Sequence, residues 1–189
     1  MADQKKREEL LRESEARFRT LFETLTLGVV YHHRNGTILR ANPAACRILG
    51  MTIEQLQGRT SLDPHWRSIH EDGSDFPGDT HPSMKALETG RVVENVVMGV
   101  YHASTGSYGW INIHAVPQFR PGEDQPYQVY ATFEDITERK KIQDEIKRLA
   151  RFPGENPNPV LRIGRDGTME FGNQASQGLL RHWETAIGQ

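Results

Sequence analysis

The sequence is poor in several features that would identify a function at once. It has a single cysteine, Cys46, so no disulfide can form within the chain and a reduced, cytoplasmic setting is expected. Its apolar runs, such as 96–100, are far shorter than the ~20 residues that span a bilayer. The formal net charge is only -2, which favours neither nucleic acid nor anionic lipid as a partner. We therefore expect no nucleic-acid partner and no membrane segment.

Catalytic motifs are also missing from the sequence. We find no glycine-rich phosphate loop and no known arrangement of nucleophile, base and acid. Three carboxylates, Glu71, Asp72 and Asp75, lie in a polar stretch where solvated side chains are more common than catalytic ones. The sequence therefore predicts a regulatory domain without catalytic residues.

Two charged segments predict helices on either side of a central domain. The first, over 1–25, has no glycine or proline, and the second, over 135–151, opens with several charged residues. Their apolar residues recur at spacings typical of an amphipathic helix: Leu11, Phe18, Leu21 and Leu25 in the first, and Ile142, Ile146 and Leu149 in the second. Two heptads are too short for an independent coiled coil. The first helix therefore packs on its own domain, on a partner chain or on upstream sequence, and a homodimer through the flanking helices is expected.

Turn and capping signals predict how the central domain, 26–134, begins. The Asn-Gly pair at 35–36 lies between two β-prone runs and predicts a hairpin with a type I′ turn, in which both central residues have positive φ. Asn42 is then expected to cap a short helix that stops at Gly50, and Thr52 to begin another with a capping box. The following stretch, 58–79, is expected to be mostly irregular because it is rich in glycine, proline and aspartate.

Three further β-rich runs complete the predicted sheet. The runs 92–104, 108–119 and 127–134 are joined by short turns, which predicts antiparallel neighbours and, with the hairpin, five strands in total. A helix over 81–90 precedes them, with Met84 and Leu87 on one face. In the middle run, polar and apolar side chains alternate, so that one face should point into the core. The sequence thus predicts an α+β domain.

A partial internal repeat suggests a second domain of the same kind. Residues 30–42 are echoed by 161–173 at an offset of 131 residues, which is the size of a domain plus a linker. The matching positions are Gly36 and Gly167, Thr37 and Thr168, and Asn42 and Asn173. We therefore expect 152–189 to be the truncated start of a second copy.

The order of these elements resembles the PAS family with its C-terminal PAC part, over about 18–142. The most specific piece is Asp-Ile-Thr-Glu-Arg at 135–139, which is similar to the family's junction between the last strand and the output helix. Asn-Gly at 35–36, Ala-Asn-Pro-Ala at 41–44 and the entry segment 17–23 carry the rest. The resemblance implies the PAS fold, a curved five-stranded antiparallel sheet with helices on one face.

The resemblance also implies a function. PAS domains commonly sense a ligand or a partner and precede a histidine kinase or a cyclic-di-nucleotide output domain. We therefore expect a sensory domain of a multidomain signal-transduction protein, such as a two-component system, with an output domain downstream. The alternative is a dimerisation or scaffold module that binds no ligand.

Apolar periodicity predicts which residues are buried but not whether they enclose a cavity. A small-molecule pocket and a filled core therefore both remain open, with Trp66, Trp110 or Asn112 as polar groups in the pocket case. The candidate pocket residues are Val30, Ile48, Leu56, Trp66, Met84, Leu87, Val97, Trp110, Asn112, Ile113 and Val129.

No cofactor is strongly indicated. A flavin photosensor of the light-oxygen-voltage type would need its reactive cysteine in a different helix from Cys46. For haem, His65, His70 and His81 lie near the position where some haem-binding relatives place an axial ligand, and His81 is the best of these weak candidates. The strand histidines lack the tight spacing of a metal site. We expect no tightly bound haem, flavin or metal.

A helix that continues directly from the last strand offers a mechanical route for a signal. We predict that Asp135 is the hinge and the helix cap, next to Thr137. A change at the sheet would alter the packing of Tyr130, Phe133 and Ile136 and so move the helix that follows.

Overall fold

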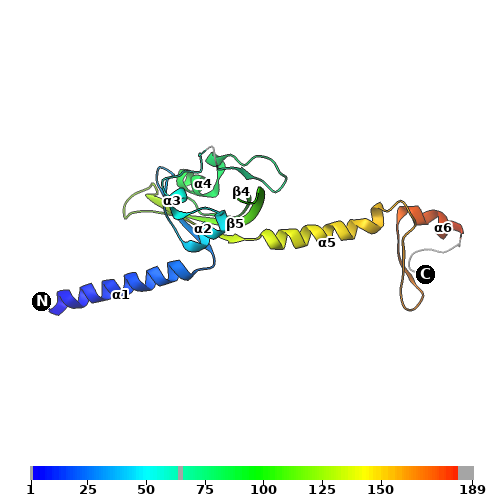
Figure 1. Cartoon of the computed structure of the whole chain (residues 1–189), viewed down its shortest axis with the longest axis horizontal. Helices are drawn as coiled ribbons and strands as arrows, with labels where there is room; N and C mark the ends of the chain where they lie inside the picture. The colour runs from blue at the N-terminus through cyan, green and yellow to red at the C-terminus, as the bar shows by residue number, and fades with distance from the viewer. Residues whose placement is uncertain (1, 64–65, 183–189) are drawn as a thin grey trace. The chain divides into compact units, whose positions relative to one another are not determined.

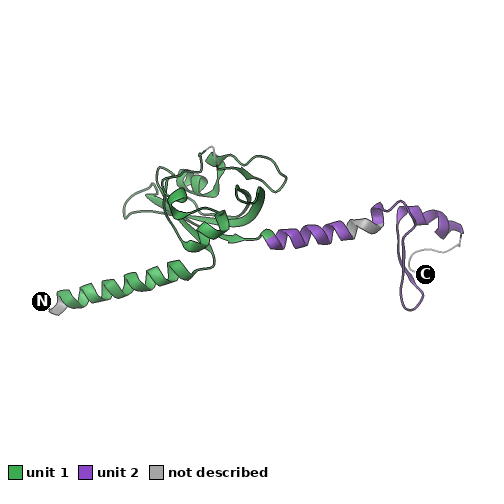
Figure 2. Ribbon diagram, viewed as in Figure 1, with its two compact units in different colours: residues 1–137 green, residues 138–189 purple. Residues whose placement is uncertain are grey.

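The computed structural model describes residues 2–63 and 66–182. The chain divides into two compact units, 1–137 and 138–189 (Figure 2). In the first unit the elements are, in order, α1 (Ala2–Thr24), β1 (Gly28–His33), β2 (Ile38–Ala41), α2 (Pro43–Leu49), α3 (Ile53–Leu56), β3 (Ser68–Ile69), a 3-10 turn (Gly78–Thr80), α4 (Pro82–Thr89), β4 (Val93–His102), β5 (Ser107–Gln118) and β6 (Gln128–Asp135). α5 (Thr137–Glu155) begins at the boundary with the second unit.

The sheet of the first unit has the strand order β2-β1-β6-β5-β4-β3, and all its neighbours are antiparallel. The predicted α+β class is confirmed, but the predicted count of five strands is one too low. The sixth strand, β3, has two residues, Ser68 and Ile69, which pair with β4 inside the stretch that we expected to be irregular. Two residues are too few to show an alternating pattern in the sequence.

The β1–β2 hairpin forms where it was predicted, but its turn is of another type. Gly36 has a φ of +83°, whereas Asn35 does not have a positive φ, so the turn is not type I′. The Gly36 N–H donates to the His33 carbonyl (2.7 Å), and the His33 N–H donates to the Thr37 carbonyl (2.8 Å). These hydrogen bonds enclose a three-residue loop, 34–36, that ends in a left-handed glycine, which is another common type of hairpin connection. Asn35 uses its side chain instead, accepting a hydrogen bond from the Thr37 N–H (3.1 Å).

The predicted helix caps are confirmed. Asn42 caps α2, Pro43 is its first residue, and Gly50 ends it in the left-handed region with a φ of 65°. Thr52 and Gln55 form the capping box of α3. The N-terminus of each helix meets a side chain that accepts its free N–H groups, and α2 also ends at a left-handed glycine.

Three helices pack on one face of the sheet and enclose the core. The helices are α2, α3 and α4, which lie over the sheet in Figure 1. Their side chains join those of the central strands in one buried cluster. On β5 the predicted alternation is confirmed, since Ile111, Ile113 and Ala115 are buried while the residues between them are half-exposed. This face of the sheet is the inner one.

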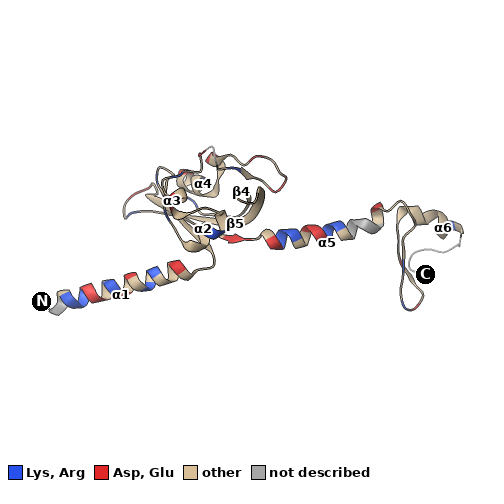
Figure 3. Cartoon of the chain, viewed as in Figure 1, with Lys and Arg blue, Asp and Glu red and all other residues tan. Residues whose placement is uncertain are grey.

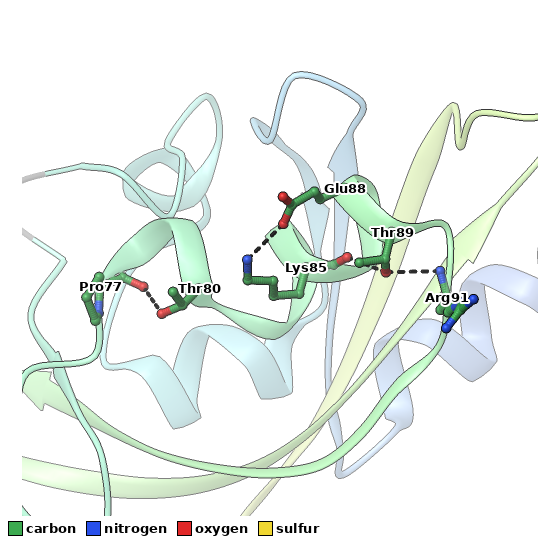
Figure 4. A network of polar contacts seen from close by, with 6 residues as sticks. All are labelled: Pro77, Thr80, Lys85, Glu88, Thr89 and Arg91. Atoms are coloured by element: carbon green, nitrogen blue, oxygen red, sulfur yellow. Dashed lines mark hydrogen bonds and ion pairs between the residues drawn. The ribbon is translucent and has the colours of Figure 1, made fainter.

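α4 covers the central strands with its small residues. Pro82, Ser83 and Ala86 are buried, whereas Met84 and Leu87, which we expected on the apolar face, are only half-buried. Small side chains let this eight-residue helix approach the sheet closely. Its outer side carries polar contacts, including a 2.8 Å ion pair between Lys85 and Glu88 (Figure 4).

The two long helices are charged along their length (Figure 3). Near the end of α1, Phe22 is buried beside Tyr31, with 6.2 Å between the ring centroids, and the Arg40 guanidinium lies 5.1 Å from the Phe22 ring. Among the side chains that the structure describes, the other large apolar ones of the two helices remain exposed: Leu10, Leu11, Phe18 and Leu21 in α1, and Ile142, Ile146 and Leu149 in α5. Within the described residues, no helix is long and apolar enough to cross a membrane.

The second unit contains a small hairpin after α5. β7 (Leu161–Ile163) pairs with β8 (Met169–Gly172), and a 3-10 turn (Gln174–Ser176) leads into α6 (Gln177–His182). Residues 183–189, the end of the predicted second copy, lie outside the described residues. Asn173 sits between hairpin and helix, as Asn42 does in the first unit.

Candidate functional site

A cavity of about 50 Å³ lies between the inner face of the sheet and α4. Of the predicted pocket residues, Val30, Trp66 and Ile113 line it. Its remaining walls are mostly apolar and come from both the strands and the helices. The apolar residues are Ile38, Leu49, Pro82, Met98, Ile111, Ala131 and Phe133, and the hydroxyl residues are Thr60, Ser61 and Ser83.

Other predicted pocket residues fill the core instead. Leu56 and Val129 are fully buried in the main cluster, and Ile48 and Leu87 pack at its edge. Met84 is half-buried near the hairpin turn, where its side chain lies against Gly36. The inner face therefore contains both a packed core and a small cavity.

Three predicted pocket residues lie on the wrong face of the sheet. Met98 pairs with Ile111 and both line the cavity, so their neighbours on each strand point to the other face. Val97 pairs with Asn112, and Gly99 with Trp110. The prediction of Val97, Trp110 and Asn112 as pocket residues therefore conflicts with the strand alternation: residues of opposite phase cannot share one pocket.

Two buried histidines also line the cavity. The sequence analysis missed His32 and considered His81 only as a weak haem-ligand candidate. His32 lies on β1 two residues after Val30, so strand alternation was the available signal that it points inward. Its Nδ1 lies 3.2 Å from the Gly36 carbonyl oxygen. Burial lowers the pKa of His32 from 6.5 to about 4, because an imidazolium would lose its hydration there. His32 is therefore neutral at pH 7.

His81 lies on the opposite wall and is held by the loop before α4. Its Nε2 lies 2.8 Å from the Ser68 hydroxyl and 3.1 Å from the Phe76 carbonyl oxygen. Burial lowers the pKa of His81 as well. This ring is therefore a hydrogen-bonded part of the cavity wall. His70 stacks on Phe76 at 3.9 Å, and His65 lies outside the described residues.

Trp66 contributes a polar group that has no partner. Its indole Nε1 is buried and makes no hydrogen bond to any residue that the structure describes. A buried donor of this kind destabilises a fold by about 1–3 kcal/mol. Trp66 lines the cavity, but its Nε1 has almost no accessible surface, so this donor is enclosed by the surrounding side chains.

The junction between β6 and α5 is fastened to the neighbouring strand. The Trp110 N–H donates to the Thr137 hydroxyl (2.8 Å), and the Ile136 N–H donates to the Trp110 carbonyl (2.8 Å). Asp135, the last residue of β6, accepts a hydrogen bond from the Thr137 N–H (2.9 Å). The first residues of α5 are thus tied to β5 by the backbone of a single residue.

The predicted relay residues on β6 point to both faces of the sheet just before this junction. Phe133 is buried and lines the cavity, and Ile136 is buried three residues later. Tyr130 lies on the outer face, with its ring 6.1 Å from that of Tyr31. A continuous strand therefore connects a cavity wall to the start of α5.

Comparison with known proteins identifies the domain. A family model described as PAS domain matches residues 16–79. The PAS domain of an HTR-like protein from Haloarcula marismortui aligns with a TM-score of 0.53 at 22% identity, covering 70% of this chain and 99% of that one. A PAS domain from Colwellia psychrerythraea aligns with a TM-score of 0.50 at 22% identity, covering 66% and 98%. This chain contains a PAS domain.

Curated proteins that are similar to the PAS chain are much longer. The sensor histidine kinase TmoS of Ectopseudomonas mendocina is 27% identical over 159 residues, which are 82% of this chain and 14% of that protein. The C4-dicarboxylate transport sensor protein DctS of Rhodobacter capsulatus is 28% identical, over 84% and 22%. The probable diguanylate cyclase DgcE of Escherichia coli is 26% identical, over 72% and 12%. The chain thus spans less than a quarter of each relative.

Proposed function

We propose that this PAS domain is a sensory and regulatory module of a larger signalling protein, and that α5 relays its state to an output domain. The similarity to two sensor proteins and a diguanylate cyclase supports an output of the histidine kinase or cyclic-di-nucleotide type. The proposal places the domain in the cytoplasm, where the free thiol of Cys46 stays reduced.

The observation that carries the proposal is the fastening of α5 to β5 at Trp110. Because Thr137 and Ile136 bond to the backbone of Trp110, a shift of β5 or β6 is transmitted to the first turn of α5. Phe133 connects the same strand to the cavity. A ligand that alters the cavity wall can therefore shift the balance between two arrangements of the junction, as a relay requires.

Two variants of Thr137 test the relay in the full-length protein that carries this domain. Thr137→Val keeps the shape of the side chain but removes the hydroxyl, so we expect a loss of signal-dependent output of about fivefold or more. Thr137→Ser keeps the hydroxyl and should retain the response. Asp135→Ala should act in the same direction, with a loss of only about 1 kcal/mol in stability. Normal output from Thr137→Val would overturn the relay.

A homodimer through α1 and α5 is the second part of the proposal. Both helices present exposed apolar stripes flanked by alternating charges, and neither stripe is covered within the described residues (Figure 3). Helices of this length gain stability when such a stripe is buried against a partner helix. In sedimentation experiments Ile146→Glu should weaken self-association, while Asp144→Gln on the opposite side of α5 should not.

The third part of the proposal is that 152–189 begins a second PAS domain. Asn173 Oδ1 accepts hydrogen bonds from the N–H groups of Val160 and Ser176 (both 3.0 Å), and its Nδ2 donates to the carbonyl of Asn158 (2.8 Å). Each of these positions lies 131 residues after its counterpart around Asn42. The repeat thus extends from sequence to hydrogen bonding.

A ligand-free dimerisation or scaffold module is the second candidate function. It is favoured by the small size of the cavity, about 50 Å³, and by the core positions of Leu56 and Val129. In that case the dimer would form, but the domain would bind no small molecule.

A further inference from the structure

The ring of His102 lies where α2, β4 and β5 meet. His102 is the last residue of β4 and points to the inner face, two residues after the buried Val100. A Cβ on Gly50, the C-cap of α2, would lie 3.5 Å from Cγ of this ring. A Cβ on Gly109 of β5 would lie only 2.9 Å from its Cε1. The ring therefore lies against the backbone of both elements.

Nε2 of His102 is enclosed but has no partner. The atom is buried and makes no hydrogen bond to any residue within the described ranges, 2–63 and 66–182. The β4–β5 turn holds the backbone of His102 in place, since its carbonyl accepts from the N–H groups of Thr105 (3.2 Å) and Gly106 (2.9 Å). A buried polar atom without a partner destabilises the arrangement that contains it, so an arrangement that supplies a partner gains free energy.

The Thr137 hydroxyl lies near this nitrogen, and its proton has a poor acceptor. A Cβ on Gly109 would lie 3.1 Å from Nε2 of His102 and 3.6 Å from Oγ1 of Thr137, so both atoms border the same point. Oγ1 accepts from the Trp110 N–H (2.8 Å), but the Trp110 carbonyl to which it donates is 3.5 Å away. This distance is at the limit of a hydrogen bond, and the same carbonyl already accepts from the Ile136 N–H (2.8 Å).

The two groups complement each other. A neutral imidazole has one bare nitrogen that accepts, and a hydroxyl has one proton to donate. We propose that His102 is a positioning residue of the junction between β6 and α5, and that this junction has a second arrangement in which the Thr137 hydroxyl donates to Nε2 of His102. This proposal rests on the relay proposed above and names the contact that forms its second arrangement.

The two arrangements differ in how the first residue of α5 is fastened. In the described arrangement, Thr137 is bonded to β5 through Trp110. In the second arrangement, it is also bonded to the end of β4. The Trp110 N–H can keep its bond to the same oxygen, because a hydroxyl oxygen has two acceptor sites. A good hydrogen bond then replaces a weak one, which shifts the balance between two states by about fivefold.

Relaxation-dispersion NMR on the full 189-residue chain tests for the second arrangement. We expect exchange on the microsecond-to-millisecond timescale at the backbone amides of Trp110 and Thr137. His102→Leu replaces the ring by a side chain of similar size without the acceptor, and should abolish this exchange. His33→Leu, at the exposed end of β1, is the control and should retain it. No exchange in the unmodified chain, or the same exchange in His102→Leu, would overturn the proposal.

The ¹⁵N spectrum of the histidine side chains is a second test, which does not depend on whether His102→Leu folds. The sequence has eight histidines, and the signals that are missing from His102→Gln belong to His102. In mildly alkaline buffer we expect the proton of this ring on Nδ1 and a bare Nε2. A proton on Nε2 would overturn the proposal, because that nitrogen could not accept a hydrogen bond.

Signal-dependent output of the full-length protein that carries this domain is the third measurement. His102→Leu should reduce it by about fivefold, as for the loss of one hydrogen bond. His102→Gln keeps an acceptor at a similar reach and should retain the response. If His102 only filled space, leucine would replace it at least as well as glutamine. An equal or reversed order of the two variants would therefore overturn the proposal.

The two proposals fail separately. If Thr137→Val abolishes signal-dependent output but His102→Leu leaves it intact, only the role of His102 is overturned. If exchange at Trp110 disappears in His102→Leu but Thr137→Val leaves output unchanged, the contact exists and the relay through α5 is overturned instead.

Discussion

Asn42 and Asn173 form the same hydrogen-bonded frame in two very different surroundings. Each accepts bonds from two backbone N–H groups, one 13 residues earlier and one three residues later, and each donates to a carbonyl near the preceding strand. The first frame lies within a six-stranded sheet and a large core, whereas the second belongs to a two-stranded hairpin. The frame is therefore encoded locally, while the burial around it depends on strands that follow much later.

The largest expected effect comes from removing the first frame. Asn42→Ala leaves two buried N–H groups and one carbonyl without a partner, so we expect the free energy of unfolding of the first unit to fall by about 3 kcal/mol or more. Chemical denaturation measures this. Asn173→Ala should leave the same transition unchanged, and a loss below about 1 kcal/mol for Asn42→Ala would contradict the importance of the frame.

A second difference between the copies is their response to pH. The pKa of His32 is about 4 in the fold against 6.5 unfolded, so the unfolded chain binds more protons between these values. The stabilisation is complete above pH 6.5 and falls as the pH drops, by about 2–3 kcal/mol from pH 7 to 4.5. The lowered pKa of His81 acts in the same direction.

Denaturation curves at several pH values check this dependence. His32→Asn should flatten the curve, because asparagine does not titrate. The second copy has Ile163 at the position that corresponds to His32, so no such titration is expected there. A pH dependence of equal steepness in His32→Asn would show that other groups are responsible.

A smaller loss of stability is expected from a substitution of Gly28, because the backbone of β1 lies against the ring of Phe133 at this position. A Cβ on Gly28 would clash with the ring of Phe133, so Gly28→Ala should destabilise the first unit by about 1–3 kcal/mol. In α6 a Cβ on Gly178 would meet nothing within 4 Å, so Gly178→Ala should instead stabilise its helix slightly. Thermal unfolding of both variants tests the opposite signs.

The smallest effect is expected at the hairpin turns. Asn35 Oδ1 accepts from the Thr37 N–H in the first copy, and Asp166 Oδ1 accepts from the Thr168 N–H (3.0 Å) in the second. Asp166→Asn should therefore keep the turn, with no measurable change in the NMR shifts of β7 and β8. Loss of these shifts would mean that the charge of Asp166 is needed, since its bond to the Thr168 N–H lowers the pKa of that carboxyl.

The features that the sequence predicted well are those that depend on neighbouring residues. The caps at Asn42 and Thr52 and the alternation of β5 follow from backbone groups and side chains a few positions apart. The type I′ turn was wrong because a three-residue loop with Gly36 satisfies the same signal. The two-residue β3 forms only because β4 lies beside it.

The site was harder to predict because it depends on contacts between distant segments. His32 and His81 face one cavity although 49 positions separate them, and no local pattern brings them together. The alternation rule would have placed His32 inward and Trp110 and Asn112 outward, had it been applied to the pocket as well as to the strands. The size of the cavity follows from side-chain packing alone, which periodicity does not specify.

Phe22, near the end of α1, and Thr137, at the start of α5, both contact strands of the same sheet. More than 100 residues of chain separate these positions, yet Phe22 packs on β1 and Thr137 bonds to β5, with only β6 between those strands. Two steps of a β-ladder are about 10 Å. Under the relay proposed above, a twist at Phe22 would reach Thr137 sideways, through the ladder hydrogen bonds of β1, β6 and β5, with the cavity empty or filled. Domains of this kind arranged in series would pass mechanical strain along a protein as well as respond to ligands of their own.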